Sequence, residues 1–117
     1  MYGYILITIS MTFSAASNLG KWSKIWLETY KINLEHNTFD MYLNIIENHI
    51  IGSEIENIQL SKIKGQHLQK MVNEKIDKGL TRIVKIFQLS LKQIFQQAIE
   101  NEMIYKNVAN GIKIPTF

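Results

Sequence analysis

The feature that most constrains the fold of this chain is a long amphipathic segment that follows a glycine-containing turn. Gly79-Leu80-Thr81 comes first, and apolar side chains then recur at intervals of three and four residues as far as Asn101. Glycine tolerates the left-handed conformation that ends many helices, and a threonine hydroxyl can accept backbone N–H bonds where the next helix starts. The sequence therefore predicts a helix over residues 81–101, capped by Thr81. Its predicted buried side consists of Val84, Phe87, Leu91, Ile94, Phe95, Ala98 and Ile99.

The same helical period runs through most of the chain beyond residue 20. The other predicted helices are 20–32, 38–49 and 65–78, and a short turn follows near the C-terminus. Thr38 stands where an N-cap is expected, and Leu60 and Ile63 should anchor the connection 51–63 to the core. A chain of 117 residues with 46% hydrophobic residues can build one compact core. We therefore predict a single all-α domain over residues 20–111.

The chain offers no recognisable catalytic or metal site. It has no cysteine, which excludes disulfides, cysteine nucleophiles and thiolate metal ligands. The histidines His36, His49 and His67 lack metal-binding spacing, and no serine stands in a Gly-x-Ser-x-Gly elbow. We therefore predict no catalytic residue, no metal and no cofactor.

Residues 1–19 open with an apolar run, Tyr2 to Met11. The run is about half as long as a membrane-spanning helix must be, and Thr8 and Ser10 interrupt it. No lysine or arginine precedes it, as the start of a signal peptide would require. We predict no membrane span, and we interpret residues 1–19 as an N-terminal arm that is either a short strand or disordered.

Charge is unevenly distributed between the two halves of the chain. Residues 1–59 carry a net charge of −3, whereas residues 60–117 carry ten basic and four acidic side chains, a net charge of +6. Such asymmetry is typical of a face that binds a polyanion, although a solvated basic face without a partner has the same composition.

The side of the predicted helix 81–101 that lies opposite its apolar stripe is basic and rich in amides. It carries Arg82, Lys85, Gln88 and Lys92, with no acidic residue before Glu100. Lysine and arginine can neutralise phosphates, and glutamine can read adenine in a major groove but is also an ordinary helix former. This pattern favours phosphate and base contacts over catalysis.

Two further places could meet phosphate. Lys64 and His67 lie near the start of the predicted helix 65–78, where His67 could also be a half-buried histidine with one hydrogen bond. Asn37 and Thr38 precede the second helix, where backbone N–H groups form a possible anion site. Thr38 can serve as a cap, a phosphate contact or both.

A series of short motifs resembles the core-binding, or N-terminal SAM-like, domain of tyrosine recombinases of the phage-integrase type. The resemblance lies in their order and spacing. The motifs are the aromatic segment 22–30, Asn37-Thr38 with Tyr42, the segment 49–52, the segment 58–63, Gly79-Leu80-Thr81, the segment 91–95 with Ala98, and the segment 107–109. Two departures concern charge and shape. Gly52 stands where the family often has proline, and Glu35 and His36 stand where the family usually has a basic residue and a proline.

The resemblance implies a SAM-like bundle of four to five helices, packed orthogonally, that clamps duplex DNA opposite a separate catalytic domain. Residues 112–117 would begin the linker to that domain, which is absent from this chain. The partners implied are double-stranded DNA and other integrase subunits, in the cytoplasm of a bacterial host. The second and fourth helices would face DNA, and the residues so implicated are Asn37, Thr38, Tyr42, Thr81, Arg82, Lys85, Gln88 and Lys92.

One alternative belongs to another class of function. SAM-like bundles also mediate contacts between proteins, so the chain could be a helical protein–protein interaction module without DNA binding. DNA binding must weaken steeply with ionic strength, whereas an apolar interface would not. A helix-turn-helix regulator is disfavoured, because the segment after Gly79 is much longer than a recognition helix.

Overall fold

The computed structural model describes residues 17–116. These residues form helices, turns and loops, with one isolated bridge between Asn18 and Gln59. In chain order the elements are α2 (Leu19–Tyr30), α3 (His36–Ile45), the π-helical turn η1 (Ile46–Ile50), the 3-10 turn η2 (Leu60–Lys62), α4 (Gly65–Asp77), α5 (Thr81–Glu100) and the 3-10 turn η3 (Val108–Gly111). The prediction of an all-α fold is confirmed.

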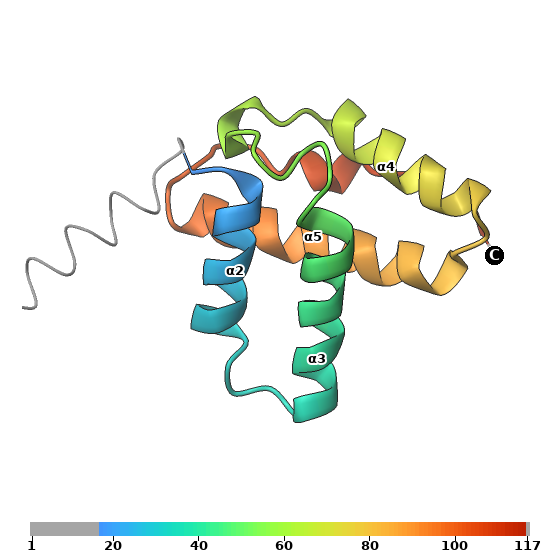
Figure 1. Ribbon diagram of the computed structural model, residues 1–117. Coiled ribbons are helices and arrows are strands. Elements are labelled where there is room, and N and C mark those ends of the chain that lie inside the picture. The colour runs from blue at the N-terminus through green and yellow to red at the C-terminus, as the bar shows by residue number, and fades with distance from the viewer. Residues whose placement is uncertain (1–16, 117) are drawn as a thin grey trace, which may run out of the picture.

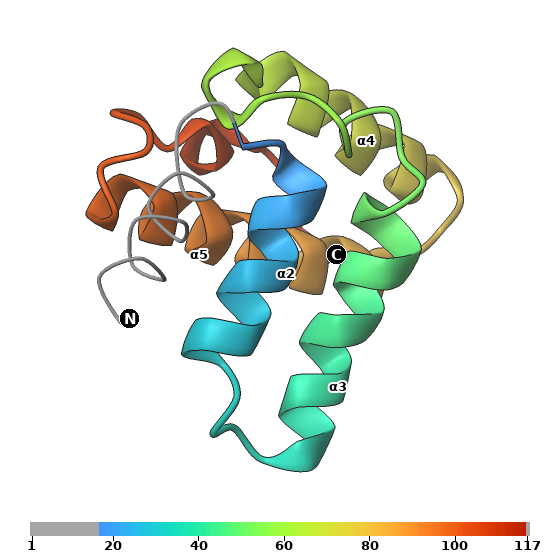
Figure 2. The ribbon, with the colours of Figure 1, turned by 60° about the vertical axis from the view of Figure 1, so that its left-hand side comes forward.

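The bundle is arranged around α5. α2 and α3 form an antiparallel hairpin that lies across α5, and the connection between them projects away from the other helices (Figure 1). α4 packs along α5, outside the α2–α3 hairpin, as the second view also shows (Figure 2). α5 packs against all three of the other long helices, so it is the central element of the described fold.

The core follows the buried side of α5. The predicted stripe is confirmed, since Val84, Phe87, Leu91, Ile94, Phe95 and Ala98 are each fully buried and Ile99 is partly buried. Trp22 of α2 is also fully buried, and its indole N–H donates to the carbonyl of Ile94 at 2.9 Å. A buried indole that finds an acceptor avoids the free-energy cost of an unsatisfied donor. The predicted anchors Leu60 and Ile63 are buried as well.

The first turn of α2 is held by a segment nearly forty residues further along the chain. The side chain of Asn18 accepts from the N–H of Lys21 at 2.8 Å. The N–H groups of Leu19 and Gly20 donate to the carbonyls of Ile58 and Glu56, at 3.1 and 2.9 Å. Residues 17–19, which we expected in the N-terminal arm, are therefore part of the fold. The prediction for residues 1–16 lies outside the described residues.

α3 begins at His36, and the prediction that Thr38 is its N-cap is wrong. The N-cap is Glu35, whose carbonyl accepts from the N–H of Phe39 at 2.9 Å without any bond from its side chain. Across the same turn, His36 Nε2 lies 3.1 Å from the carboxylate of Asp40. The helix starts earlier because Glu35 has a non-helical backbone, with a φ of −52° and a ψ of 144°, which leaves Thr38 half-buried inside the first turn.

Gly79 ends α4 as predicted, but Thr81 does not cap α5. Gly79 has a φ of 73°, its N–H donates to Ile76, and the N–H of Leu80 donates to Lys75, at 2.9 and 3.0 Å. These two bonds make a Schellman motif. The turn makes Leu80 the N-cap of α5, without a side-chain bond, so the helix starts before the Thr81 hydroxyl can act as a cap.

Replacing Gly79 by alanine should lower the free energy of unfolding by about 1 to 2 kcal/mol, because a Cβ is disfavoured in the left-handed conformation. Urea denaturation followed by circular dichroism would measure the loss. Gly111→Ala is the matched control, since Gly111 has open space around it and no positive φ. Equal stability of the two variants would show that the left-handed turn carries no cost.

The C-terminal segment, expected to begin a linker, packs against the bundle as far as Lys113. Ile112 is buried, and its carbonyl accepts from the side-chain amide of Gln88 at 3.1 Å. Gln69 of α4 donates to the carbonyl of Lys113 at 2.8 Å and accepts from its N–H at 2.7 Å. Side chains from both α4 and α5 therefore fix the path of this segment.

Candidate nucleic-acid interface

The outer face of α5 carries the most continuous basic surface of the predicted site. Arg82, Lys85, Leu89 and Gln96 are exposed, and Lys92 is half-buried beside them. Intervals of three, four and seven residues place these side chains along one side of the helix, opposite the core stripe. No acidic residue occurs in α5 before Glu100. We call Arg82, Lys85, Leu89, Lys92 and Gln96 the α5 strip.

Two lysines of the C-terminal segment, Lys106 and Lys113, each adjoin a residue that is hydrogen-bonded to α5. Asn107 donates from its side chain to the carbonyl of Lys92 at 3.0 Å, which brings its neighbour Lys106 to this part of α5. The side chain of Gln88 donates to the carbonyl of Ile112, which brings the next residue, Lys113, close to α5. Lys106 and Lys113 are both exposed. The sequence did not predict these two lysines as part of the site, because only the tertiary fold brings this segment next to α5. The one signal in the sequence was the excess of basic residues in residues 60–117.

Two glutamines of α5 are occupied within the fold. Gln88 holds the C-terminal segment, and Gln93 donates to the hydroxyl of Tyr42 at 3.0 Å. Both are half-buried. Base readout by these amides would require breaking the bonds that position α3 and the C-terminal segment. Gln96 is exposed and belongs to the strip, and its Oε1 accepts from the side chain of Asn107 at 3.5 Å.

Tyr42 lies in the core and does not face outward with Asn37. Its ring is 7% exposed and meets Trp26 edge-on, with 5.4 Å between ring centroids. The ammonium group of Lys31 lies 5.6 Å from the Tyr42 ring. This position argues against the expected DNA contact, because the aromatic packing and the hydrogen bond from Gln93 leave little of the side chain for a duplex.

The outer face of α3 has a different character from the α5 strip. Asn37 is exposed and Thr38 is half-buried, but no lysine or arginine occurs between Lys31 and Lys62. The carboxylate of Asp40 lies on the exposed side, near His36. This face therefore offers amides and one hydroxyl rather than cations, and any contact with phosphate there would rely on neutral donors.

Lys64 and His67 lie apart from the α5 strip. The ring nitrogen Nδ1 of His67 accepts from the N–H of Lys64 at 2.9 Å, so His67 helps to close the first turn of α4. Lys64 precedes this helix and Arg82 follows its end, and the 13 residues of α4 span about 20 Å. The structure thus distributes the predicted residues over the start of α3, the start of α4 and the outer face of α5.

The described part of the chain lacks two features that other functions would need. Within residues 17–116, no three histidine, cysteine, aspartate or glutamate side chains cluster in a way that could hold a metal ion. Over the same residues, no helix combines the length and the apolar character needed to cross a bilayer.

Comparison with known proteins then decides the family. Residues 18–76, which include α2, α3 and α4 almost to its end, match the family described as "Phage integrase, N-terminal SAM-like domain". The chain belongs to this family. The predicted resemblance is therefore confirmed, and the integrase domain is all-α in the structure. No curated protein and no solved structure matches the chain.

The match to the integrase family ends before α5 begins. Family membership accordingly identifies a recombinase-related domain through its α2–α3 hairpin and α4. The α5 strip therefore lies outside the matched residues.

Proposed function

We propose that this chain is the DNA-binding domain of a site-specific tyrosine recombinase and grips duplex DNA through the α5 strip. The observation that carries the proposal is the acid-free outer face of α5, with Lys106 and Lys113 beside it. Arginine and lysine on one face neutralise phosphates and release counterions from the duplex. Membership of the integrase family supports DNA as the polyanion.

The dimensions of α5 suit this role. Arg82 and Lys92 are ten residues apart, which corresponds to about 15 Å along a helix. A major groove about 12 Å wide admits a helix, and cations along its edge can reach phosphates. Asn37 and Thr38 would add neutral contacts from α3, and Lys64 and His67 would touch a more distant phosphate. Thr81, exposed at the first position of α5, could donate its hydroxyl to the same backbone.

In such a recombinase the breaking and rejoining of strands would reside in a separate catalytic domain. This chain would bind one side of the core site, and other integrase subunits would bind the neighbouring sites, in the bacterial cytoplasm. Phosphate contacts and groove shape would supply most of the affinity, because few exposed side chains on the α5 strip can read a base edge. Binding by this domain alone should accordingly be weak.

A second function has its own supporting observation. Tyr30, Ile32 and Leu34, in and beside the connection between α2 and α3, are 41%, 59% and 37% exposed. Exposed apolar side chains that cluster in this way are found at protein–protein interfaces. A helical interaction module is therefore the alternative.

Salt dependence separates the two functions. Fluorescence anisotropy of a labelled duplex of about 30 base pairs should show binding at 50 mM salt. With about three to five phosphate contacts, the affinity should fall roughly 40- to 500-fold at 200 mM salt. An absence of binding at low salt by the folded domain, or an affinity that salt leaves unchanged, would contradict the proposal and favour the interaction module.

A further inference from the structure

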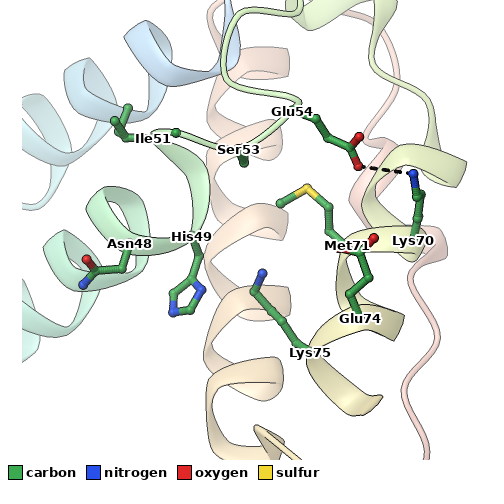
Figure 3. Close-up of a pocket in the computed structure, with 10 residues that line it drawn as sticks. Asn48, His49, Ile51, Ser53, Glu54, Lys70, Met71, Glu74 and Lys75 are labelled. Atoms are coloured by element: carbon green, nitrogen blue, oxygen red, sulfur yellow. Dashed lines mark ion pairs between the residues drawn. The ribbon is translucent and has the colours of Figure 1, made fainter. Parts of the chain in front are cut away.

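A cavity of about 370 Å³ opens between η1, the segment that follows it, and α4. In Figure 3 the side chain of His49 enters it from η1, and those of Met71 and Lys75 enter from α4. α5 passes behind the three side chains. The cavity lies on the core side of α5, because both His49 and Lys75 contact the ring of Phe87.

Lys75 differs from Lys70, the other lysine of this cavity. Lys70 pairs with the carboxylate of Glu54 at 3.6 Å, and both of these side chains are largely exposed. Lys75 is half-buried, and it belongs to neither ion pair found among residues 17–116. Its Nζ lies 4.6 Å from the centroid of the Phe87 ring. The amine therefore faces an open space, and no carboxylate lies within ion-pair distance of it in the ion pairs of the described residues.

The surroundings of Lys75 lower the pKa of its amine below the ordinary lysine value. Burial lowers the pKa of Lys75; Glu74 opposes this shift, and the like charge of Lys78 adds to it. Burial also lowers the pKa of His49, and the charge of Lys75 lowers it further. The contact with Phe87 stabilises the charged amine, whereas desolvation, the largest cause of the pKa shift, disfavours it.

The π-helical turn η1 shapes the wall opposite Lys75. The N–H of Ile51 donates to the carbonyl of Ile46 at 2.9 Å, across five residues. Ile46 and Ile50 both remain buried, while the His49 ring meets Phe87 with 6.2 Å between centroids. π-helical turns are rare and frequently occur at functional sites. The turn thus places an imidazole on the wall across from the amine.

We propose that Lys75 is a site of acylation, at which an activated acyl donor such as an acyl phosphate enters the cavity and acylates Nζ. The nitrogen lone pair attacks the carbonyl carbon, a C–N bond forms, and the C–O bond to phosphate breaks. Phosphate leaves with the electron pair, and the nitrogen releases a proton to solvent. The product is a neutral amide that remains in the cavity beside Met71 and Phe87.

Mass spectrometry of the intact chain, treated with limiting acetyl phosphate, tests the proposal. We expect the folded protein to acquire acetyl at Lys75 several-fold faster than at its median lysine. Unfolding in urea should reduce the acetylation rate of Lys75 to that of the median lysine, because the faster rate depends on the cavity. Lys75→Arg should remove the fast reaction. A rate at Lys75 no higher than the median, or a lead that persists in urea, would overturn the proposal.

Two exposed acids on α4 give a matched pair of variants. Glu74→Gln should accelerate acetylation of Lys75, since it removes the carboxylate that favours the ammonium form. Asp77→Asn, on the same helix, should leave the rate unchanged, because Asp77 does not contribute to the shift at Lys75. Equal rates in the two variants would mean that local electrostatics do not control this amine. The measurement does not depend on DNA, so its failure is separable from failure of the proposed function.

Discussion

The Arg82→Ala/Lys85→Ala double variant is expected to bind duplex DNA roughly tenfold or more weakly than the unaltered chain at low salt. Both residues are exposed at the start of the α5 strip. Each phosphate contact that is lost should also flatten the plot of log affinity against log salt by about 1, so the slope should become shallower by about 2. Anisotropy titrations at several salt concentrations measure both quantities.

A control with the same change in net charge is available on α2. Lys21 and Lys24 are also exposed, one helical turn apart, but they do not belong to the α5 strip. Lys21→Ala/Lys24→Ala should therefore change affinity and slope much less. Equal losses in the two double variants would show that binding responds to overall charge, and would contradict a specific surface on α5.

Trp22→Ala is expected to cause the largest loss of stability among single substitutions. It removes a fully buried indole from the contact between α2 and α5, and with it the hydrogen bond to Ile94. Replacing a buried aromatic residue by alanine typically costs about 3 to 5 kcal/mol. A domain of this size is stable by roughly 5 to 15 kcal/mol, so much of the molecule should unfold at moderate urea concentrations.

Trp22→Phe separates the packing of the ring from the hydrogen bond. Phenylalanine retains an aromatic ring but cannot donate to Ile94, so a smaller loss of roughly 1 to 2 kcal/mol is expected. Urea denaturation monitored by circular dichroism gives both values. If alanine at this position shifted the midpoint no more than phenylalanine does, the indole would not be the main contact between the two helices.

Local pattern was sufficient for α4 and α5. Apolar side chains at intervals of three and four residues predicted α4 and α5 from their first residues, Gly65 and Thr81, because that spacing is a property of a single helix. The position of Gly79 likewise predicted the end of α4, because the left-handed backbone that ends a helix is a local requirement that glycine meets. The family resemblance was also readable, because it depends on motif order along the chain.

Helix caps could not be predicted as reliably. Thr38 and Thr81 are both suitable capping residues, yet Glu35 and Leu80 occupy the cap positions. The backbone that enters each helix decides which residue has the cap conformation. At α5 that backbone is set by the preceding Schellman turn, whose bonds reach back to Lys75 and Ile76.

The sequence by itself determined that this chain forms amphipathic helices and that its basic residues lie mostly in the second half. It also determined that α5 carries no acidic residue before Glu100. Only the tertiary structure decided how side chains distant in sequence are used. It brought Lys106 and Lys113 beside α5, buried Tyr42 against Trp26, and placed Lys75 opposite His49. The physical reason is that periodicity specifies which side of a helix is buried, whereas the partner it is buried against depends on how the helices cross.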